Sequence, residues 1–273
     1  MKLPNVLLYG DSGTGKTTAI LSLIECGITP FVQITESNAL PVVNQAKCPD
    51  LHYQHIKTGA SSWGSFRDSL KQVNLLSNDA LQKMAGIDKQ KYNQILDMVG
   101  ALSNFKCDRC GEEFGDVSEF DDTKAVVVDS LSGLNSLALG NAVGGKPILT
   151  QPDWGVCMRS ELMLIQMLTQ IPQAMFVLIA HVAMERDEVS GRILRMPKAL
   201  GTKNAPELPQ LFTDVIRSMR EGTKFTWSTI EADSVARAAH IPLAAGQTPT
   251  FHAMMKKWRE VKEEAEGGKT NVS

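Results

Sequence analysis

An eight-residue pattern near the N-terminus limits what this chain can fold into more than any other feature. Residues 10–17 read G-x-x-x-x-G-K-T and stand between a short apolar run at 5–9 and an apolar-periodic stretch at 18–24. A strand, a glycine-rich turn and a helix in this order direct backbone N–H groups and the helix N-terminus toward a polyphosphate. The pattern therefore predicts an α/β nucleotide-binding domain.

The residues of this loop have distinct expected roles. Lys16 would reach the β- and γ-phosphates of ATP, and the Thr17 hydroxyl would hold Mg²⁺. A chance glycine-rich turn is the alternative, but it does not explain why the strand and the helix flank the turn. The expected ATP contacts are Gly10, Asp11, Ser12, Gly13, Thr14, Gly15, Lys16, Thr17 and Thr18.

Three further apolar runs of strand length end in a polar side chain, namely Glu36, Asp129 and His181. Ligands of open α/β sheets bind beyond the carboxyl ends of the strands, so these side chains would face the nucleotide. Asp129 would hold Mg²⁺, Glu36 would activate a water, and His181 would contact the γ-phosphate. The alternative for Glu36 is a solvated glutamate at a strand end, and the alternative for His181 is a histidine whose hydrogen bonds are satisfied locally.

The order of these segments resembles the core of RecA-type recombinases. The resembling segments are GDSGTGKTT at 10–18, FVQITESNAL at 31–40, AVVVDSLSGL at 125–134 and MFVLIAHV at 175–182. The resemblance covers roughly residues 3–250 and implies a P-loop NTPase fold with a central, mostly parallel sheet flanked by helices. It places the family's catalytic glutamate on Glu36. The family's γ-phosphate sensor, usually a glutamine, falls on His181.

More narrowly, the chain is similar to small phage-encoded RecA-like ATPases of single-strand annealing and recombination, which begin close to the P-loop. Here four residues precede the first apolar run. The resemblance implies an ATPase acting on single-stranded DNA as a homo-oligomeric ring or filament, with a single-strand DNA-binding protein as a further partner. It implies a cytoplasmic location, in the host if phage-encoded. It also places a basic residue that reaches the neighbouring subunit's ATP on Arg237, for which a surface arginine is the alternative.

Two segments are expected to face DNA if the resemblance holds. The first, at 140–155, is rich in Gly and Pro and contains Trp154, which either stacks on a base or is buried at a helix entry. The second is a loop at 183–209, where a cationic run without acidic residues suits contact with phosphates. An ordinary solvated loop is the alternative for this run, whose cations are Arg192, Arg195, Lys198 and Lys203.

The region 61–122 reads as a helical insert within one ATPase domain at 1–251, followed by a C-terminal helix and frayed tail at 252–273. Apolar residues at helical spacing predict two helices that pack on the core. The first series is Trp63, Phe66, Leu70 and Val73, and the second is Tyr92, Ile95, Leu96, Val99 and Leu102.

The insert also contains a C-x-x-C-G turn at Cys107 and Cys110, a shape typical of zinc knuckles. Zinc takes four ligands, and Cys48, His52 and His55 qualify only if the fold brings them close. Another subunit could also donate ligands, and a metal-free turn is the alternative. Zn²⁺ is therefore a candidate cofactor beside ATP and Mg²⁺.

Composition and charge exclude some classes of function. The 28 Lys and Arg residues against 30 Asp and Glu give a net charge of −2, which excludes whole-surface nucleic-acid binding but not a local basic patch. The longest apolar stretch, 174–180, is too short to cross a membrane, and five cysteines fit a reducing compartment.

The leading function is ATP-dependent recombination or annealing of single-stranded DNA. A ring-forming motor of the helicase, loader or packaging type shares every nucleotide motif and is the first alternative. A P-loop small-molecule kinase and a non-hydrolysing nucleotide-gated module are the others.

Overall fold

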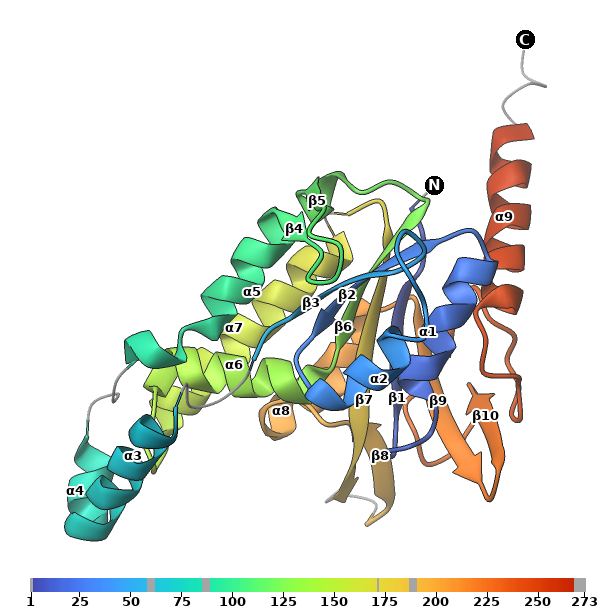
Figure 1. Cartoon of the computed structure of the whole chain (residues 1–273). Helices are drawn as coiled ribbons and strands as arrows, with labels where there is room; N and C mark the ends of the chain where they lie inside the picture. The colour runs from blue at the N-terminus through green and yellow to red at the C-terminus, as the bar shows by residue number, and fades with distance from the viewer. Residues whose placement is uncertain (1, 58–61, 85–88, 171, 187–190, 268–273) are drawn as a thin grey trace.

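The main sheet of this computed structural model is mostly parallel. The structure describes residues 2–57, 62–84, 89–170, 172–186 and 191–267. The sheet's strands are β1 (Asn5–Gly10), β2 (Thr29–Ile34), β3 (His52–His55), β6 (Lys124–Asp129), β7 (Met175–Arg186), β8 (Ile193–Pro197), β9 (Asp214–Glu221), β10 (Lys224–Ser228) and β11 (Arg237–Ala238). They lie in the order β10-β9-β1-β7-β6-β2-β3, with β11 beside β9 and β8 beside β7 (Figure 1). The α/β fold predicted from the sequence is confirmed.

Helices cover both faces of this sheet because its strands alternate between two cores. Along β1, Leu7 and Tyr9 enter one apolar cluster, whereas Val6 and Leu8 enter the other. The first cluster is closed by α5 (Gln94–Ser103), α6 (Leu131–Val143) and α7 (Gln151–Gln170), and the second by α1 (Lys16–Glu25), α2 (Leu40–Val43) and α9 (His252–Gly267). No helix among the described residues is long and apolar enough to cross a bilayer.

The sheet order brings the ends of four strands together. Strands β1, β7, β6 and β2 are successive neighbours, and all of these pairs are parallel. Gly10 at the end of β1 is level with His181, and Asp129 at the end of β6 is level with Ile34 of β2. The residues that follow these strands therefore lie along one edge of the sheet, as expected for a ligand site in an open α/β fold.

One expected core helix of the insert is exposed. Helix α3 (Trp63–Leu75) and the short α4 (Asn78–Lys83) extend away from the sheet (Figure 1). Trp63 is 87% exposed, and the other apolar residues of its series are also exposed. The prediction that this helix packs on the core is wrong, because periodicity identifies an apolar face but not the surface that covers it.

The second expected core helix is only partly covered. In α5, Ile95 and Leu102 are buried, whereas Leu96 and Val99 are exposed. The C-terminal helix α9 packs on the second core, since Met254 and Trp258 are buried and the Trp258 indole donates to the Lys2 carbonyl at 3.0 Å.

The expected loop at 183–209 is largely regular structure instead. Strand β7 continues to Arg186 and pairs with β8 in an antiparallel hairpin, and helix α8 (Gly201–Glu207) follows. The cationic, glycine-containing sequence led to the prediction of a loop, but antiparallel pairing with β7 gives part of the β8 backbone regular hydrogen-bond partners. Residues 187–190 of this segment lie outside the described residues.

A buried carboxyl group lies between α7 and α8. Glu161 is 1% exposed, and its Oε2 accepts a hydrogen bond from Asn204 Nδ2 at 3.2 Å. Burial raises the pKa of Glu161 to about 7, against the opposing effect of hydrogen bonds from Asn204 and the Leu200 backbone. The folded protein therefore favours the neutral acid.

Replacing Glu161 with glutamine should make the protein more stable above neutral pH. Because the folded pKa of about 7 exceeds the ordinary 4.5, the free energy of unfolding falls as the pH rises from 4.5 to 7. Above that range the loss is about 3 kcal/mol, and Glu161→Gln should remove it. Thermal unfolding at pH 5 and pH 8 measures this. The matched control is Glu207→Gln on the exposed side of α8. If Glu161→Gln keeps the pH dependence of the wild-type melting temperature, the raised pKa of Glu161 is not its cause.

Candidate functional site

The loop after β1 has glycines at positions where a side chain would clash or strain the backbone. A Cβ on Gly10 would lie 2.1 Å from the carbonyl oxygen of Ser218 on β9. Gly13 and Gly15 have φ angles of +72° and +82°, in the left-handed region that favours glycine. Helix α1 begins directly after Gly15, so its N-terminus points into the loop. The geometry is that of a phosphate-binding loop, as predicted.

Lys16 lies in the middle of this loop. Its ammonium donates to the Gly10 carbonyl at 3.0 Å and to the Asp11 carbonyl at 2.6 Å, and only 6% of the residue is exposed. Burial lowers the pKa of Lys16, while the charges of Asp129, Asp11 and Glu36 oppose that effect. A cation held here by carbonyl oxygens is available to a polyphosphate that enters the loop.

Thr17 and Asp129 form a pair of oxygen ligands at the other side of the loop. The Thr17 hydroxyl donates to Asp129 Oδ2 at 2.6 Å. Burial raises the pKa of Asp129 to about 6, the Thr17 hydrogen bond opposes this, and the nearby Glu36 charge adds to it. A hydroxyl and a carboxylate beside a phosphate loop are the hard donors that Mg²⁺ prefers, so these residues fit the metal.

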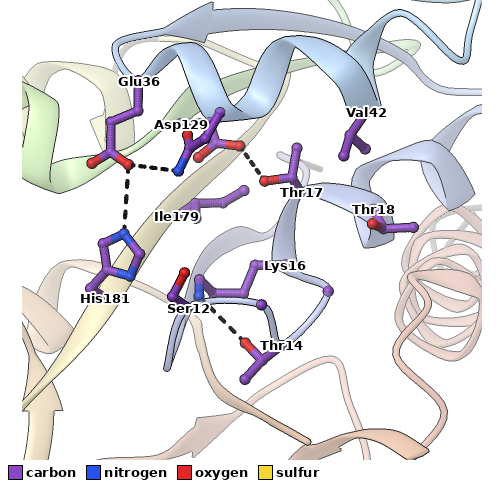
Figure 2. A pocket seen from close by; sticks show the side chains of 13 residues that line it. Ser12, Thr14, Lys16, Thr17, Thr18, Glu36, Val42, Asp129, Ile179 and His181 are labelled. Atoms are coloured by element: carbon purple, nitrogen blue, oxygen red, sulfur yellow. Dashed lines mark hydrogen bonds and ion pairs between the residues drawn. The ribbon is translucent and has the colours of Figure 1, made fainter. Parts of the chain in front are cut away.

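Glu36 and His181 both line this pocket, and their side chains point toward each other (Figure 2). His181 Nε2 lies 3.6 Å from Glu36 Oε2, and the Ser130 hydroxyl donates to Glu36 Oε1 at 2.6 Å. About a quarter of each of these two side chains is exposed. The carboxylate is thus oriented by a neighbour while it remains open to solvent, which suits a group that positions a water.

The structure brings most of the predicted site residues together. A pocket of about 260 Å³ is lined by loop residues 12–18 together with Glu36, Asp129 and His181. Gly10 and Asp11 contribute their carbonyl groups to the Lys16 ammonium, outside the pocket lining.

Arg237 lies away from the pocket of its own chain. It pairs with Val215 near the amino end of β9, whereas the loop stands at the opposite end of that strand. Its guanidinium donates to the carbonyls of Gln210 and Phe212 at 3.3 and 3.2 Å. Its predicted contact with a neighbouring subunit stays a prediction.

The cations of the run at 192–203 lie in different surroundings. Arg195 forms an ion pair with Asp233, which also pairs with Arg217 at 3.1 Å. Arg192 and Lys198 are exposed at the two ends of β8. Lys203 falls in α8, and its side chain lies outside the described residues. Trp154 is 37% exposed in the first turn of α7, so the burial considered for it is not observed.

Sequence reasoning missed several neighbours of the site. Ser130, which orients Glu36, directly follows Asp129, so the strand-end argument could have found it. Phe225 of β10 lies 3.4 Å from where a Gly15 Cβ would stand, and Arg220 covers its ring at 5.3 Å. No local signal identifies these two, because they reach the loop only through the pairing of β9 with β1.

The C-x-x-C turn lies in a second, separate cluster. It joins β4 (Phe105–Lys106) to β5 (Glu113–Gly115), a small antiparallel pair. The ligand atoms of four residues lie within 4.8 Å of one another. We call these residues, Cys48, His52, Cys107 and Cys110, the Cys/His cluster. His55, also considered from the sequence, contacts Ser37 instead, with its Nε2 at 3.2 Å from the hydroxyl.

Comparison with known families adds one finding. A family model described as an AAA domain matches residues 2–238, a range that includes the phosphate loop, Glu36, Asp129 and His181. No curated protein matches the chain.

Proposed function

Since the chain belongs to this AAA domain family and is therefore a P-loop ATPase, we propose that it acts on single-stranded DNA in recombination or annealing. Single-stranded DNA would stimulate its ATP turnover. The ATPase assignment follows from the family and from the loop geometry. The DNA substrate rests on the resemblance to RecA-like proteins and on a structural connection between the pocket and two exposed cations, Arg192 and Lys198, at the ends of β8.

The pocket residues would divide the work of hydrolysis among them. Backbone N–H groups of residues 12–18 would hold the phosphates, and Lys16 would neutralise charge that develops on the transferred phosphoryl group. Thr17 and Asp129 would hold Mg²⁺, which supplies further charge neutralisation at the phosphate oxygens. Glu36 would position a water for in-line attack and accept its proton, while Ser130 keeps the carboxylate oriented.

The observation that carries the DNA proposal is the continuity of β7. This strand holds His181 in the pocket and then extends into the β7–β8 hairpin. The backbone N–H of Lys198, just after β8, donates to the His181 carbonyl at 2.8 Å. A displacement of His181 by the γ-phosphate would thus move a segment that carries cations. Such coupling requires that the hairpin contact DNA differently in the two nucleotide states.

Replacing both Arg192 and Lys198 with alanine should weaken binding of single-stranded DNA and reduce its stimulation of ATP turnover. The slope of log affinity against log salt is negative, and each lost phosphate contact makes it less steep by about 0.7, so we expect its magnitude to fall by about 1.4. The measurement is fluorescence anisotropy of a labelled oligonucleotide across a salt series, with ATP turnover measured in parallel.

The matched control for this experiment is Lys256→Ala, because Lys256 is exposed on α9. It should leave the salt slope and the turnover unchanged. If wild-type turnover ignores single-stranded DNA and no binding occurs at low salt, the DNA proposal fails, while the ATPase assignment stands.

A ring-forming DNA motor is the second candidate, and one observation favours an assembly of some kind. The exposed apolar face of α3, with Trp63 87% exposed, is the kind of surface that a protein contact covers. We include a homo-oligomer in the proposal for this reason. ATP-driven translocation along DNA would favour the motor, whereas annealing without translocation would favour the recombination role.

A further inference from the structure

The distances within the Cys/His cluster match those of a tetrahedral metal site. A regular tetrahedron with Zn–S bonds near 2.3 Å and Zn–N bonds near 2.1 Å has edges of about 3.8 Å between sulfurs and about 3.6 Å between sulfur and nitrogen. Cys48 Sγ lies 3.9 Å from Cys107 Sγ. His52 Nδ1 lies 3.7 Å from the sulfurs of both Cys48 and Cys110. Three of the ligand–ligand distances thus match the edges of such a tetrahedron, and all four ligand atoms lie within 4.8 Å of one another.

Two ligand pairs from distant parts of the chain meet in this arrangement. Cys107 and Cys110 are separated by two residues in the turn between β4 and β5, with Gly111 at a φ of +74°. Cys48 and His52 are separated by three residues at the start of β3, the edge strand of the main sheet. The C-x-x-C spacing is common in structural zinc sites, and three cysteines with one histidine are a common ligand set there.

The surroundings keep the cluster in place and partly dry. The His52 ring stacks on Phe31 at 5.1 Å and lies 4.2 Å from Phe114. His52 and Cys107 are buried, whereas Cys110 is exposed, so one side remains open for entry of an ion. Packing that fixes a histidine ring lowers the cost of ordering it around a metal.

A nearby cation also balances the charge that such a site would carry. Three thiolates and one Zn²⁺ have a net charge of −1. Arg109 lies within the C-x-x-C turn, and its guanidinium donates to the carbonyls of Ala46 and Leu51, the latter at 2.8 Å. It thereby links the turn to the segment that contains Cys48 and His52.

We propose that the Cys/His cluster binds one Zn²⁺ ion in a structural site that fastens the edge strand β3 to the β4–β5 turn. All four positions are occupied by protein ligands, which is typical of structural rather than catalytic zinc. The site is separate from the nucleotide pocket, since none of its residues lines that pocket. The proposal therefore does not depend on the proposed function.

The test is the metal content of the full-length protein, purified under reducing conditions without chelator. We expect about one zinc per chain by elemental analysis. After exchange with Co²⁺, the visible spectrum should show tetrahedral d–d bands and thiolate charge-transfer bands. Removal of zinc with a strong chelator should lower the melting temperature by about 10 °C, and Zn²⁺ should restore it.

Two pairs of variants separate a ligand role from a general structural role. Cys110→Ser changes an exposed side chain and should lose the zinc and the charge-transfer bands. Cys157→Ser, at a buried cysteine outside the cluster, should keep both. In the same way His52→Gln should lose the metal and His55→Gln should keep it.

Two results would overturn the proposal. One is a fully reduced protein that contains no zinc and takes up neither Zn²⁺ nor Co²⁺ at micromolar concentration. The other is retention of zinc with unchanged spectra in Cys110→Ser, since the ion would then lie elsewhere. Loss of zinc with ATP turnover intact would still support the proposal, because the two sites are separate.

Discussion

Lys16→Ala should abolish detectable ATP turnover. The ammonium is the cation placed in the middle of the phosphate loop, held by the carbonyls of Gly10 and Asp11. Removing a preorganised charge of this kind costs about 10²–10³-fold in rate, and loss of phosphate binding adds to it. Turnover of ATP at saturating Mg²⁺ measures the change, and binding of a fluorescent ATP analogue separates affinity from rate.

The variant should still fold, which makes the result interpretable. Burial lowers the pKa of Lys16, so the charged side chain costs rather than adds stability in the absence of nucleotide. The circular dichroism spectrum of Lys16→Ala should therefore match that of the wild type, and its melting temperature should be no lower. Lys256→Ala on α9 is the matched lysine control and should retain full turnover. Wild-type turnover in a folded Lys16→Ala protein would mean that ATP is hydrolysed elsewhere.

Glu36→Gln should lower the turnover number by about 10²–10⁴-fold while ATP binding is retained. The amide has nearly the same shape as the carboxylate, and its oxygen can still accept the hydrogen bond from Ser130, which is 2.6 Å long in the wild type. It cannot accept a proton from the attacking water. A rate loss with unchanged affinity for ATP is the expected signature of a group that acts in the transition state.

Glu25→Gln is the matched control, because Glu25 is an exposed carboxylate at the end of α1 that pairs with His252 at 3.1 Å. It should change neither the turnover number nor the affinity for ATP. Unchanged turnover in Glu36→Gln would contradict the role of Glu36 as the base. A non-hydrolysing nucleotide-gated module, by contrast, predicts that neither the wild type nor Glu36→Gln turns over ATP.

Much of the nucleotide pocket could be predicted from the sequence because its requirements are local. Glycines at fixed spacing are needed where the backbone has a positive φ or approaches another strand, as at Gly13, Gly15 and Gly10. Polar residues after apolar runs mark strand ends, which placed Glu36 and Asp129 correctly beside the loop. The parallel sheet then brings these ends to one edge whatever the loops between them do.

Strand β9 shows where this reasoning fails. Its sequence, DVIRSMRE, contains five charged or hydroxyl-bearing side chains and does not resemble a buried strand. Asp214 is nevertheless fully buried, because its Oδ1 accepts hydrogen bonds from the backbone N–H groups of Ala239 and His240 at 2.9 and 2.7 Å. The partners come from a distant segment, so no local pattern reveals them. The same strand brings Ser218 against the phosphate loop.

The amino-acid sequence alone is enough to identify a P-loop, the α/β class and several of the residues that line the nucleotide pocket, since backbone sterics and residue spacing act over a few neighbouring positions. The Cys/His cluster depends on contacts between segments tens of residues apart. The exposure of α3 likewise depends on which distant segments pack against it. Cys107 and Cys110 supply only two ligands, and the sheet register that pairs Phe31 with His52 helps place the other two beside them. Long-range packing selects such contacts, and a single sequence carries no local signal for them.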